Sequence, residues 1–167
     1  GVGKTTIVRA VYERISRQFE FSFLLTNVRD FVQKSGLLNL QKQLLSGIWT
    51  KKVDISDLHE GATIIRRLLG HRKVLLVLDD VDKLEQLEAL CDCSWFGPGS
   101  RIIITSRDQH LLRQFGVDSM YKVERLTEAE ALELFSQMAF KKDQAGEDLQ
   151  KLSKEFVKFA AGLPLAL

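Results

Sequence analysis

Apolar residues along the chain follow two patterns that alternate, short continuous runs and positions with helical spacing. The runs at Lys73–Leu78 and Arg101–Thr105 are nearly uninterrupted, which predicts strands that are buried on both faces. A shorter apolar and aromatic run lies at Phe21–Leu25, and a last short strand is predicted at Met120–Val123. The runs are therefore candidates for the strands of one sheet.

Segments with helical spacing separate these runs. Helices are predicted at Thr6–Phe19, Leu37–Trp49, Asp57–Leu69, Leu84–Leu90 and Gln109–Gln114, with a turn at Gly97–Gly99. Asp57 and Glu60 form a possible variant of the capping box at the start of the third helix. Strands interleaved with helices predict an α/β fold, a parallel sheet with helices on both faces.

The pattern changes after Val123. Thr127–Glu130 is a capping box before a helix, and a second helix is predicted near Leu149–Ala160 after a polar loop at 141–148. The chain ends on the apolar run Gly162–Leu167. We therefore predict an α/β domain at 1–124 and the beginning of a helical subdomain at 125–167.

Composition narrows the function classes only slightly. The chain has 167 residues and a net charge of +2, which gives no argument for a nucleic acid or a membrane as partner. Cys91 and Cys93 are too few for a metal cage and poorly spaced for a mutual disulfide, so we expect a reducing compartment.

The first six residues carry the candidate chemistry. They are Gly1, Val2, Gly3, Lys4, Thr5 and Thr6, and they match the second half of the phosphate-binding P-loop pattern G-x-x-x-x-G-K-[ST]. Glycines let backbone N–H groups approach a phosphate, and the following helix turns the positive end of its dipole toward it. Lys4 is expected to reach the β- and γ-phosphates, and the Thr5 hydroxyl to bind Mg²⁺. The alternative is a glycine turn before an amphipathic helix, but the helix predicted at Thr6–Phe19 is the context that a P-loop requires, and it favours the P-loop.

Acidic residues end the first buried run. Asp79 and Asp80 follow Leu78, and open α/β sheets bind ligands at the carboxyl edge of their strands. We assign Asp79 to Mg²⁺, held directly or through water, and expect Asp80 to polarise an attacking water. The alternative is a strand-ending turn that caps the next helix, and the P-loop residues favour the metal role.

The second buried run also ends in polar residues. Arg107 follows Thr105 and Ser106, and its guanidinium could reach a terminal phosphate and report its presence. The alternative is a surface arginine without a ligand.

Five segments carry recognisable motifs, and they are Gly1–Thr6, Phe23–Asp30, Leu75–Asp82, Gly99–Asp108 and Gly162–Ala166. Together, and in family order from end to end, they resemble the nucleotide-binding core of plant disease-resistance proteins, the NB-ARC family of switch ATPases. Asp82, where the coiled-coil branch usually has Trp, resembles the branch that carries an N-terminal TIR domain. Ser106 departs from the family, which often has a second Thr there, but it keeps a hydroxyl.

The resemblance implies a P-loop NTPase sheet followed by part of the helical ARC subdomain, with ADP, ATP and Mg²⁺ as ligands. It implies that Lys4, Thr5 and Asp79 handle phosphate and Mg²⁺ and that Arg107 senses the γ-phosphate. Pro164 would pack against the nucleotide, although a proline also suits a simple helix start. In the parent protein the implied partners are TIR and leucine-rich-repeat domains and self-association, and the implied location is cytoplasmic or nucleocytoplasmic.

Two classes of function compete. In the first, the parent is a defence-signalling switch, held off by ADP and turned on by ATP, with slow hydrolysis. In the second, it is a working P-loop enzyme such as a motor ATPase or a small-molecule kinase. Asp80 stands where many working ATPases have Glu, and Gly162–Leu167 also favours the switch. A nucleic-acid ATPase is a weaker third interpretation, because no basic stripe or aromatic platform is present.

The sequence begins inside the P-loop motif, so we expect an internal fragment whose first strand, central in such sheets, is absent. The sheet should then show a gap or close imperfectly. Residues 1–167 alone are expected to aggregate and to bind ADP weakly or not at all.

Overall fold

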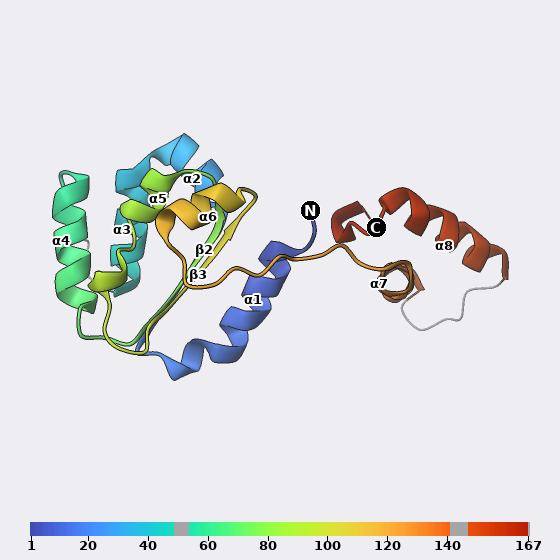
Figure 1. Ribbon diagram of the computed structural model, residues 1–167, viewed down its shortest axis with the longest axis horizontal. Helices are drawn as coiled ribbons and strands as arrows, with labels where there is room; N and C mark the ends of the chain where they lie inside the picture. The colour runs from blue at the N-terminus through green and yellow to red at the C-terminus, as the bar shows by residue number, and fades with distance from the viewer. Residues whose placement is uncertain (49–53, 141–146, 167) are drawn as a thin grey trace. The chain divides into compact units, whose positions relative to one another are not determined.

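The computed structural model describes residues 1–48, 54–140 and 147–166, and it groups the chain into two compact units. The larger unit is Thr5–Met120, and the smaller combines Gly1–Lys4 with Tyr121–Leu167. In chain order the elements are α1 (Lys4–Ile15), a 3-10 turn (Ser16–Gln18), β1 (Phe21–Leu25), α2 (Val28–Ser35), α3 (Leu37–Ile48), α4 (Leu58–Leu69), β2 (Val74–Val81), α5 (Leu84–Glu88), a 3-10 turn (Cys93–Trp95), β3 (Arg101–Ser106), α6 (Gln109–Phe115), α7 (Glu128–Phe140), α8 (Glu147–Ala160) and a 3-10 turn (Pro164–Ala166) (Figure 1).

The strands form one parallel sheet in the order β1-β2-β3. Phe21 of β1 pairs with Val74 of β2, and Leu75 of β2 pairs with Arg101 of β3. Parallel neighbours need crossover connections, and α2–α4 and α5 supply them. The predicted α/β fold with a parallel sheet is confirmed. Among the described residues the sheet has no gap, and β2 pairs directly with β3 through one register shift between Leu78 and Val81.

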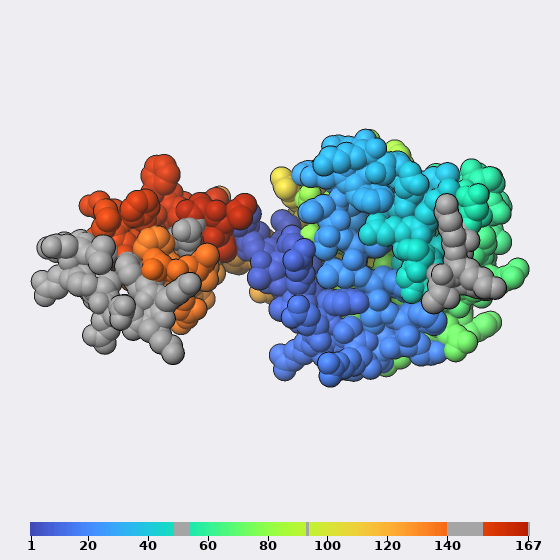
Figure 2. Space-filling view, turned by 180° about the vertical axis from the view of Figure 1, so that it is seen from behind, coloured from blue at the N-terminus to red at the C-terminus, as the bar shows by residue number. Residues whose placement is uncertain are grey.

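Side chains of β2 alternate between two apolar clusters, one on each face of the sheet. Val74, Leu76 and Leu78 lie in the larger cluster, together with residues of α2 to α6. Leu75 and Val77 pack on the other face with Val8 of α1. The continuous apolar run of β2 is thus explained by helices on both faces, which Figure 1 shows as α1 on one side and α2–α6 on the other. Seen from behind, the blue and cyan residues from α1 to α3 form much of the visible surface of the larger unit (Figure 2).

The predicted cap of α4 is present. The Asp57 carboxylate accepts a hydrogen bond from the backbone N–H of Glu60 at 2.8 Å, and the Glu60 carboxylate accepts one from the backbone N–H of Ser56 at 2.8 Å. Hydrogen bonds from the Ser56 hydroxyl and backbone N–H hold the pKa of Glu60 below its ordinary value. The start of α4 is therefore fixed by two hydrogen bonds in opposite directions. They differ from the usual capping box because the Glu60 side chain bonds to the residue before the N-cap and not to the N-cap itself.

The smaller unit contains α7 and α8, which pack through Ala131, Val157 and Ala160. The capping box before α7 is confirmed, because Thr127 N–H donates to Glu130 Oε2 at 2.8 Å and Glu130 N–H donates to Thr127 Oγ1 at 3.3 Å. Gly162 accepts from Leu126 N–H at 2.9 Å and has a φ of +72°, a conformation that favours glycine.

Some local predictions were wrong. No strand forms at Met120–Val123, and Tyr121 is 85% exposed. Three apolar side chains in four residues bury too little surface to hold a strand on the sheet edge without a pairing partner. Residues 147 and 148, predicted as loop, begin α8, while 141–146 and Trp49 lie outside the described residues. α5 ends at Glu88, two residues early, and α2 was not predicted.

Within residues 1–48, 54–140 and 147–166, no helix is long and apolar enough to span a bilayer.

Gly61 in α4 faces a buried glutamine. Gln41 is fully buried, and its Nε2 donates to the carbonyls of Leu58 at 3.0 Å and Ala89 at 2.7 Å. A Cβ on Gly61 would collide with Gln41 Oε1 and would lie 2.9 Å from Ile55 Cδ1. The two hydrogen bonds leave the glutamine no easy way to move aside, so the site requires glycine for space.

We predict that Gly61→Ala lowers the free energy of unfolding by about 1–3 kcal/mol, because overpacking outweighs the better helix propensity of alanine. Urea denaturation measures the change, and Thr63→Ala on the exposed side of α4 is the control, expected within about 0.5 kcal/mol of wild type. In a Gln41→Ala background the Gly61→Ala change should cost less, because only the end of the Ile55 side chain, at 2.9 Å, still has to shift. An equal cost in both backgrounds would show that Gln41 is not the obstacle.

Candidate phosphate-binding site

The residues of the predicted P-loop lie at the start of α1. Gly3 has a φ of +91°, which a residue with a Cβ adopts only with strain, and Lys4 is the first residue of the helix. No residue in the first turn of α1 is acidic, so the helix supplies no acid of its own at its N-terminus. Thr5 and Thr6 follow in the same turn, and Gly1 and Val2 precede it. A positive-φ glycine therefore stands directly before a helix N-terminus, the kind of place where proteins bind anions.

Thr5 and Asp79, two of the predicted site residues, lie in contact in the structure. The Thr5 hydroxyl donates a hydrogen bond of 2.8 Å to Asp79 Oδ2, although the two residues are 74 positions apart. Asp79 is completely buried at the carboxyl end of β2. Its other carboxylate oxygen, Oδ1, accepts a hydrogen bond of 2.6 Å from the Thr105 hydroxyl of β3. Two hydroxyls from two different elements therefore satisfy one buried carboxylate.

A bulge in β2 creates this geometry. Leu78 pairs with Ile104 and Val81 with Ser106, so β2 has one more residue than β3 over this stretch. The extra residue lets Asp80 adopt a φ of +61°, a left-handed conformation that aspartate tolerates better than most residues. Its backbone N–H donates to Thr105 Oγ1 at 2.9 Å. Thr105 thus bridges the carboxylate of one aspartate and the backbone of the next.

Asp80 has partners of a different kind. Its Oδ2 lies 3.1 Å from Arg29 Nη2, and its Oδ1 lies 3.2 Å from Arg107 Nε. Arg29 also contacts Asp30 through Nε at 3.2 Å. The hydrogen bond to Asp30, and then the charge of Asp80, raise the pKa of Arg29 above its ordinary value, so this side chain stays charged. The Asp80 side chain, 18% exposed, is thus held between two cations.

The structure brings together most of the predicted site residues of the larger unit. Thr5, Asp79, Asp80 and Arg107 are linked through Thr105 or direct contacts. In the smaller unit, Pro164 begins a 3-10 turn as its fixed φ suggests, and a Cβ built on Gly3 would lie 3.9 Å from Pro164 Cγ. The roles of these residues toward a ligand stay predictions.

Sequence reasoning missed Thr105 and Arg29. Thr105 lies inside the buried run of β3, where its hydroxyl looked like an ordinary strand position. Arg29 is the second residue of α2. Asn27, with a φ of +54°, makes the turn between β1 and α2, and this turn brings Arg29 to the carboxyl edge of the sheet. The signal for both was their place near a strand end, where site residues collect in such folds: Thr105 is one residue before the end of β3, and Arg29 is four residues after the end of β1.

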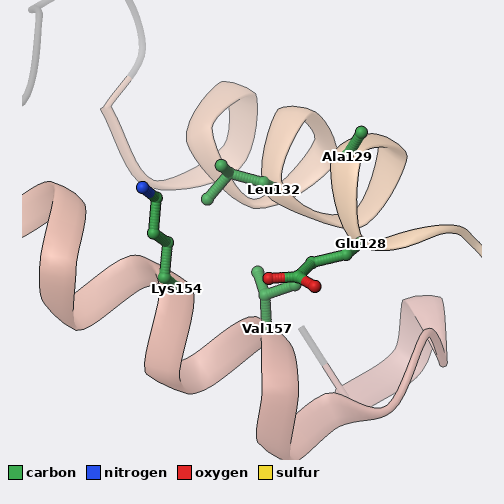
Figure 3. A pocket seen from close by; sticks show the side chains of 5 residues that line it. All are labelled: Glu128, Ala129, Leu132, Lys154 and Val157. Atoms are coloured by element: carbon green, nitrogen blue, oxygen red, sulfur yellow. The ribbon is translucent and has the colours of Figure 1, made fainter.

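A pocket of about 330 Å³ lies elsewhere, between α7 and α8. Glu128, Ala129 and Leu132 line it from α7, and Lys154 and Val157 line it from α8 (Figure 3). It contains none of the predicted site residues. Its carboxylate and mostly apolar wall suit a phosphate poorly, so we place the candidate site at the sheet edge and not in this pocket.

The described residues contain no group of three or more His, Cys, Asp or Glu side chains that could hold a metal ion.

The fold has a parallel sheet, a glycine-containing turn before α1 and a buried acid, Asp79, near the carboxyl end of β2. These features define an α/β protein of the P-loop nucleotide-binding class. Comparison with known families agrees, because the NB-ARC domain matches residues 1–145. The chain belongs to the NB-ARC family, whose domains bind nucleotides.

The relatives are plant proteins. The chain is 42% identical over 170 residues to Disease resistance protein RUN1 of Vitis rotundifolia, and 42% identical over 175 residues to TMV resistance protein N of Nicotiana glutinosa. It is 41% identical over 181 residues to Disease resistance protein RPS6 of Arabidopsis thaliana. The whole chain is covered in each case, but it spans only 13%, 15% and 16% of these relatives.

We predict that Thr105→Val lowers the free energy of unfolding by about 1–3 kcal/mol, because it leaves a buried carboxylate oxygen and a backbone N–H without a partner. Thr105→Ser keeps the hydroxyl and loses one methyl group, so it should cost only about 0.8 kcal/mol. Chemical denaturation of both variants measures the difference. Equal losses would mean that packing, and not the hydroxyl, accounts for the contribution of this residue.

Proposed function

We propose that this chain is the nucleotide-binding switch of a plant disease-resistance protein, which binds ADP in its resting state and ATP in its active state and hydrolyses ATP slowly. The observation that carries the proposal is the 2.8 Å hydrogen bond from the Thr5 hydroxyl to Asp79. It joins the last residue of the P-loop pattern to the acid at the carboxyl edge of β2. A glycine turn or a simple strand end alone would not require these two residues to meet.

Lys4 and the backbone of Gly1–Gly3 are proposed to bind the phosphates. A lysine ammonium is a compact charge that suits the β- and γ-phosphates, and the N-terminal N–H groups of α1 add donors. Val2 and Thr6 contribute backbone groups on either side. Arg107 is proposed to contact the γ-phosphate, and Pro164 to pack against the nucleotide.

The oxygens of Thr5 and Asp79 fit Mg²⁺. This ion is usually held by one or two protein oxygens together with water and substrate phosphates, so a full protein cage is unnecessary. When bound, Mg²⁺ would offset part of the phosphate charge. Asp79 would supply an oxygen atom to the site, and Thr105 would hold the Asp79 side chain in place through Oδ1.

The environment of Asp80 favours a switch over a working enzyme. Asp80 is proposed to polarise the attacking water, but both of its carboxylate oxygens contact arginines. Because each oxygen already faces a guanidinium group, neither is free to accept a hydrogen bond from an attacking water unless an ion pair opens first. Slow turnover follows from this, and a nucleotide that stays bound can be read by partners.

Regions outside this chain complete the proposal. The relatives are resistance proteins several times longer than the chain, so TIR and leucine-rich-repeat domains are the proposed intramolecular partners, with self-association of the parent. For the parent protein we also propose a cytoplasmic or nucleocytoplasmic location.

Lys4→Arg in the full-length gene product should lower ADP affinity at least about tenfold, because the planar guanidinium is too broad for a site that fits an ammonium. Isothermal titration calorimetry with ADP and Mg²⁺ measures this. Lys34→Arg, an exposed position of α2, is the matched control and should bind as wild type does. Equal ADP affinity in Lys4→Arg and wild type would remove Lys4 from the site.

Steady-state ATP turnover by the full-length gene product should fall below the enzyme median of about 10 s⁻¹, and the purified protein should carry ADP. Phosphate release with and without DNA gives the rate, and denaturation followed by chromatography identifies the bound nucleotide. Rapid turnover without retained ADP would favour the working enzyme, and stimulation by DNA would favour a nucleic-acid ATPase.

A further inference from the structure

The two arginines at the sheet edge share one carboxylate. Asp80 offers Oδ2 to Arg29 and Oδ1 to Arg107, at 3.1 Å and 3.2 Å. Each oxygen therefore has its own cation, and the charge of the carboxylate is divided between them. The left-handed backbone of Asp80 in the bulge directs the side chain to this position between β1 and β3.

The two arginines differ in how they are held. The Arg29 side chain is 28% exposed and has a second acid, Asp30, at 3.2 Å from its Nε. The Arg107 side chain is 70% exposed, and its contact with Asp80 goes through Nε. An exposed guanidinium on a flexible stem can exchange one anion for another at small cost. Arg29 is therefore the fixed partner of Asp80, and Arg107 is the exchangeable one.

We propose that Asp80 is the resting counter-ion of Arg107 and that Arg29 is a positioning residue which weakens this pair enough for a terminal phosphate to take Arg107 away. The inference rests on the proposed function, in which Arg107 contacts the γ-phosphate. A phosphate group carries more negative charge than a carboxylate, and two of its oxygens can accept a pair of parallel hydrogen bonds from an arginine, as a carboxylate does. ADP lacks this group and leaves Arg107 on Asp80, whereas ATP competes for it.

The role of Arg29 follows from charge. With Arg29 present, Asp80 is partly neutralised and attracts Arg107 less strongly. Without it, the full carboxylate charge acts on Arg107, and the γ-phosphate has a stronger competitor. Arg29 thus sets the preference for ATP over ADP without touching the nucleotide.

The test is the ratio of two affinities in the full-length gene product, for ADP and for a non-hydrolysable ATP analogue, each with Mg²⁺. Arg29→Gln should reduce the affinity for the ATP analogue relative to ADP by about two- to fivefold, the range expected for partly exposed ion pairs. Asp80→Asn should change the ratio in the opposite direction, because it removes the competing anion. Arg29→Lys keeps the charge and should restore most of the wild-type ratio.

A double-mutant cycle decides whether Arg29 acts through Asp80. In the Asp80→Asn background, Arg29→Gln should leave the ratio unchanged. The matched control is Arg72→Gln, which removes an arginine paired with Glu20 at 3.0 Å at the opposite end of the strands and should not change the ratio. A general loss of folding would lower both affinities together and leave their ratio unchanged.

The outcomes separate this inference from the function on which it rests. If wild type binds neither nucleotide, or if Arg107→Gln leaves the ratio unchanged, the γ-phosphate contact of Arg107 is wrong and both fail. If Arg107→Gln changes the ratio but Arg29→Gln does not, only the positioning role of Arg29 is overturned. An equal effect of Arg29→Gln with Asp80 and with Asn at position 80 would also overturn it.

Discussion

A carboxylate completely removed from solvent, that of Asp79, is the constraint on which the rest of the site depends. Burying an ionised group is costly unless hydrogen bonds replace its water, and burial on both faces of β2 leaves little access to solvent. The donors are the hydroxyls of Thr5 and Thr105. Because one belongs to α1 and the other to β3, a single satisfied side chain fixes a helix N-terminus and a neighbouring strand relative to β2.

The bulge explains how two adjacent acids can serve one edge of the sheet. Successive side chains of a regular strand point to opposite faces, which would place Asp80 on the other side from Asp79. The extra residue and the left-handed φ of Asp80 change this direction. Asp79 then takes uncharged donors and Asp80 takes cations. Similar carboxylates in neighbouring positions thus have different electrostatic surroundings, and this division is what permits them different roles.

The fold was largely predictable because its strongest determinants are local. The uninterrupted apolar runs gave β2 and β3, and capping residues such as Asp57 and Thr127 marked helix starts. The strand expected at 120–123 failed because a strand depends on pairing and buried area, which a short apolar run does not reveal. α2 was missed because its start depends on a left-handed conformation at Asn27, and no simple pattern signals it.

The candidate site was predictable only in part, for a related reason. Motif spacing identified Thr5, Asp79 and Arg107, since each stands at a fixed offset from a helix start or a strand end. Arg29 and Thr105 take their importance from contacts across the sheet edge, and these depend on the register of β2 against β3 and on the turn after β1. Sequence patterns report which element a residue belongs to, but they do not report which neighbour its side chain meets.

The balance of charges at the sheet edge connects this geometry to the kind of function proposed. A switch needs two states that a ligand stabilises to different degrees, whereas an enzyme needs contacts that strengthen in the transition state. Here Asp80 and the two arginines already pair with one another, so an arriving phosphate must exchange partners with existing charges. On the proposed function, part of the binding free energy would then be used to rearrange these ion pairs. Such a site would distinguish a nucleotide with a terminal phosphate from one without it, and less of the binding free energy would remain to accelerate hydrolysis.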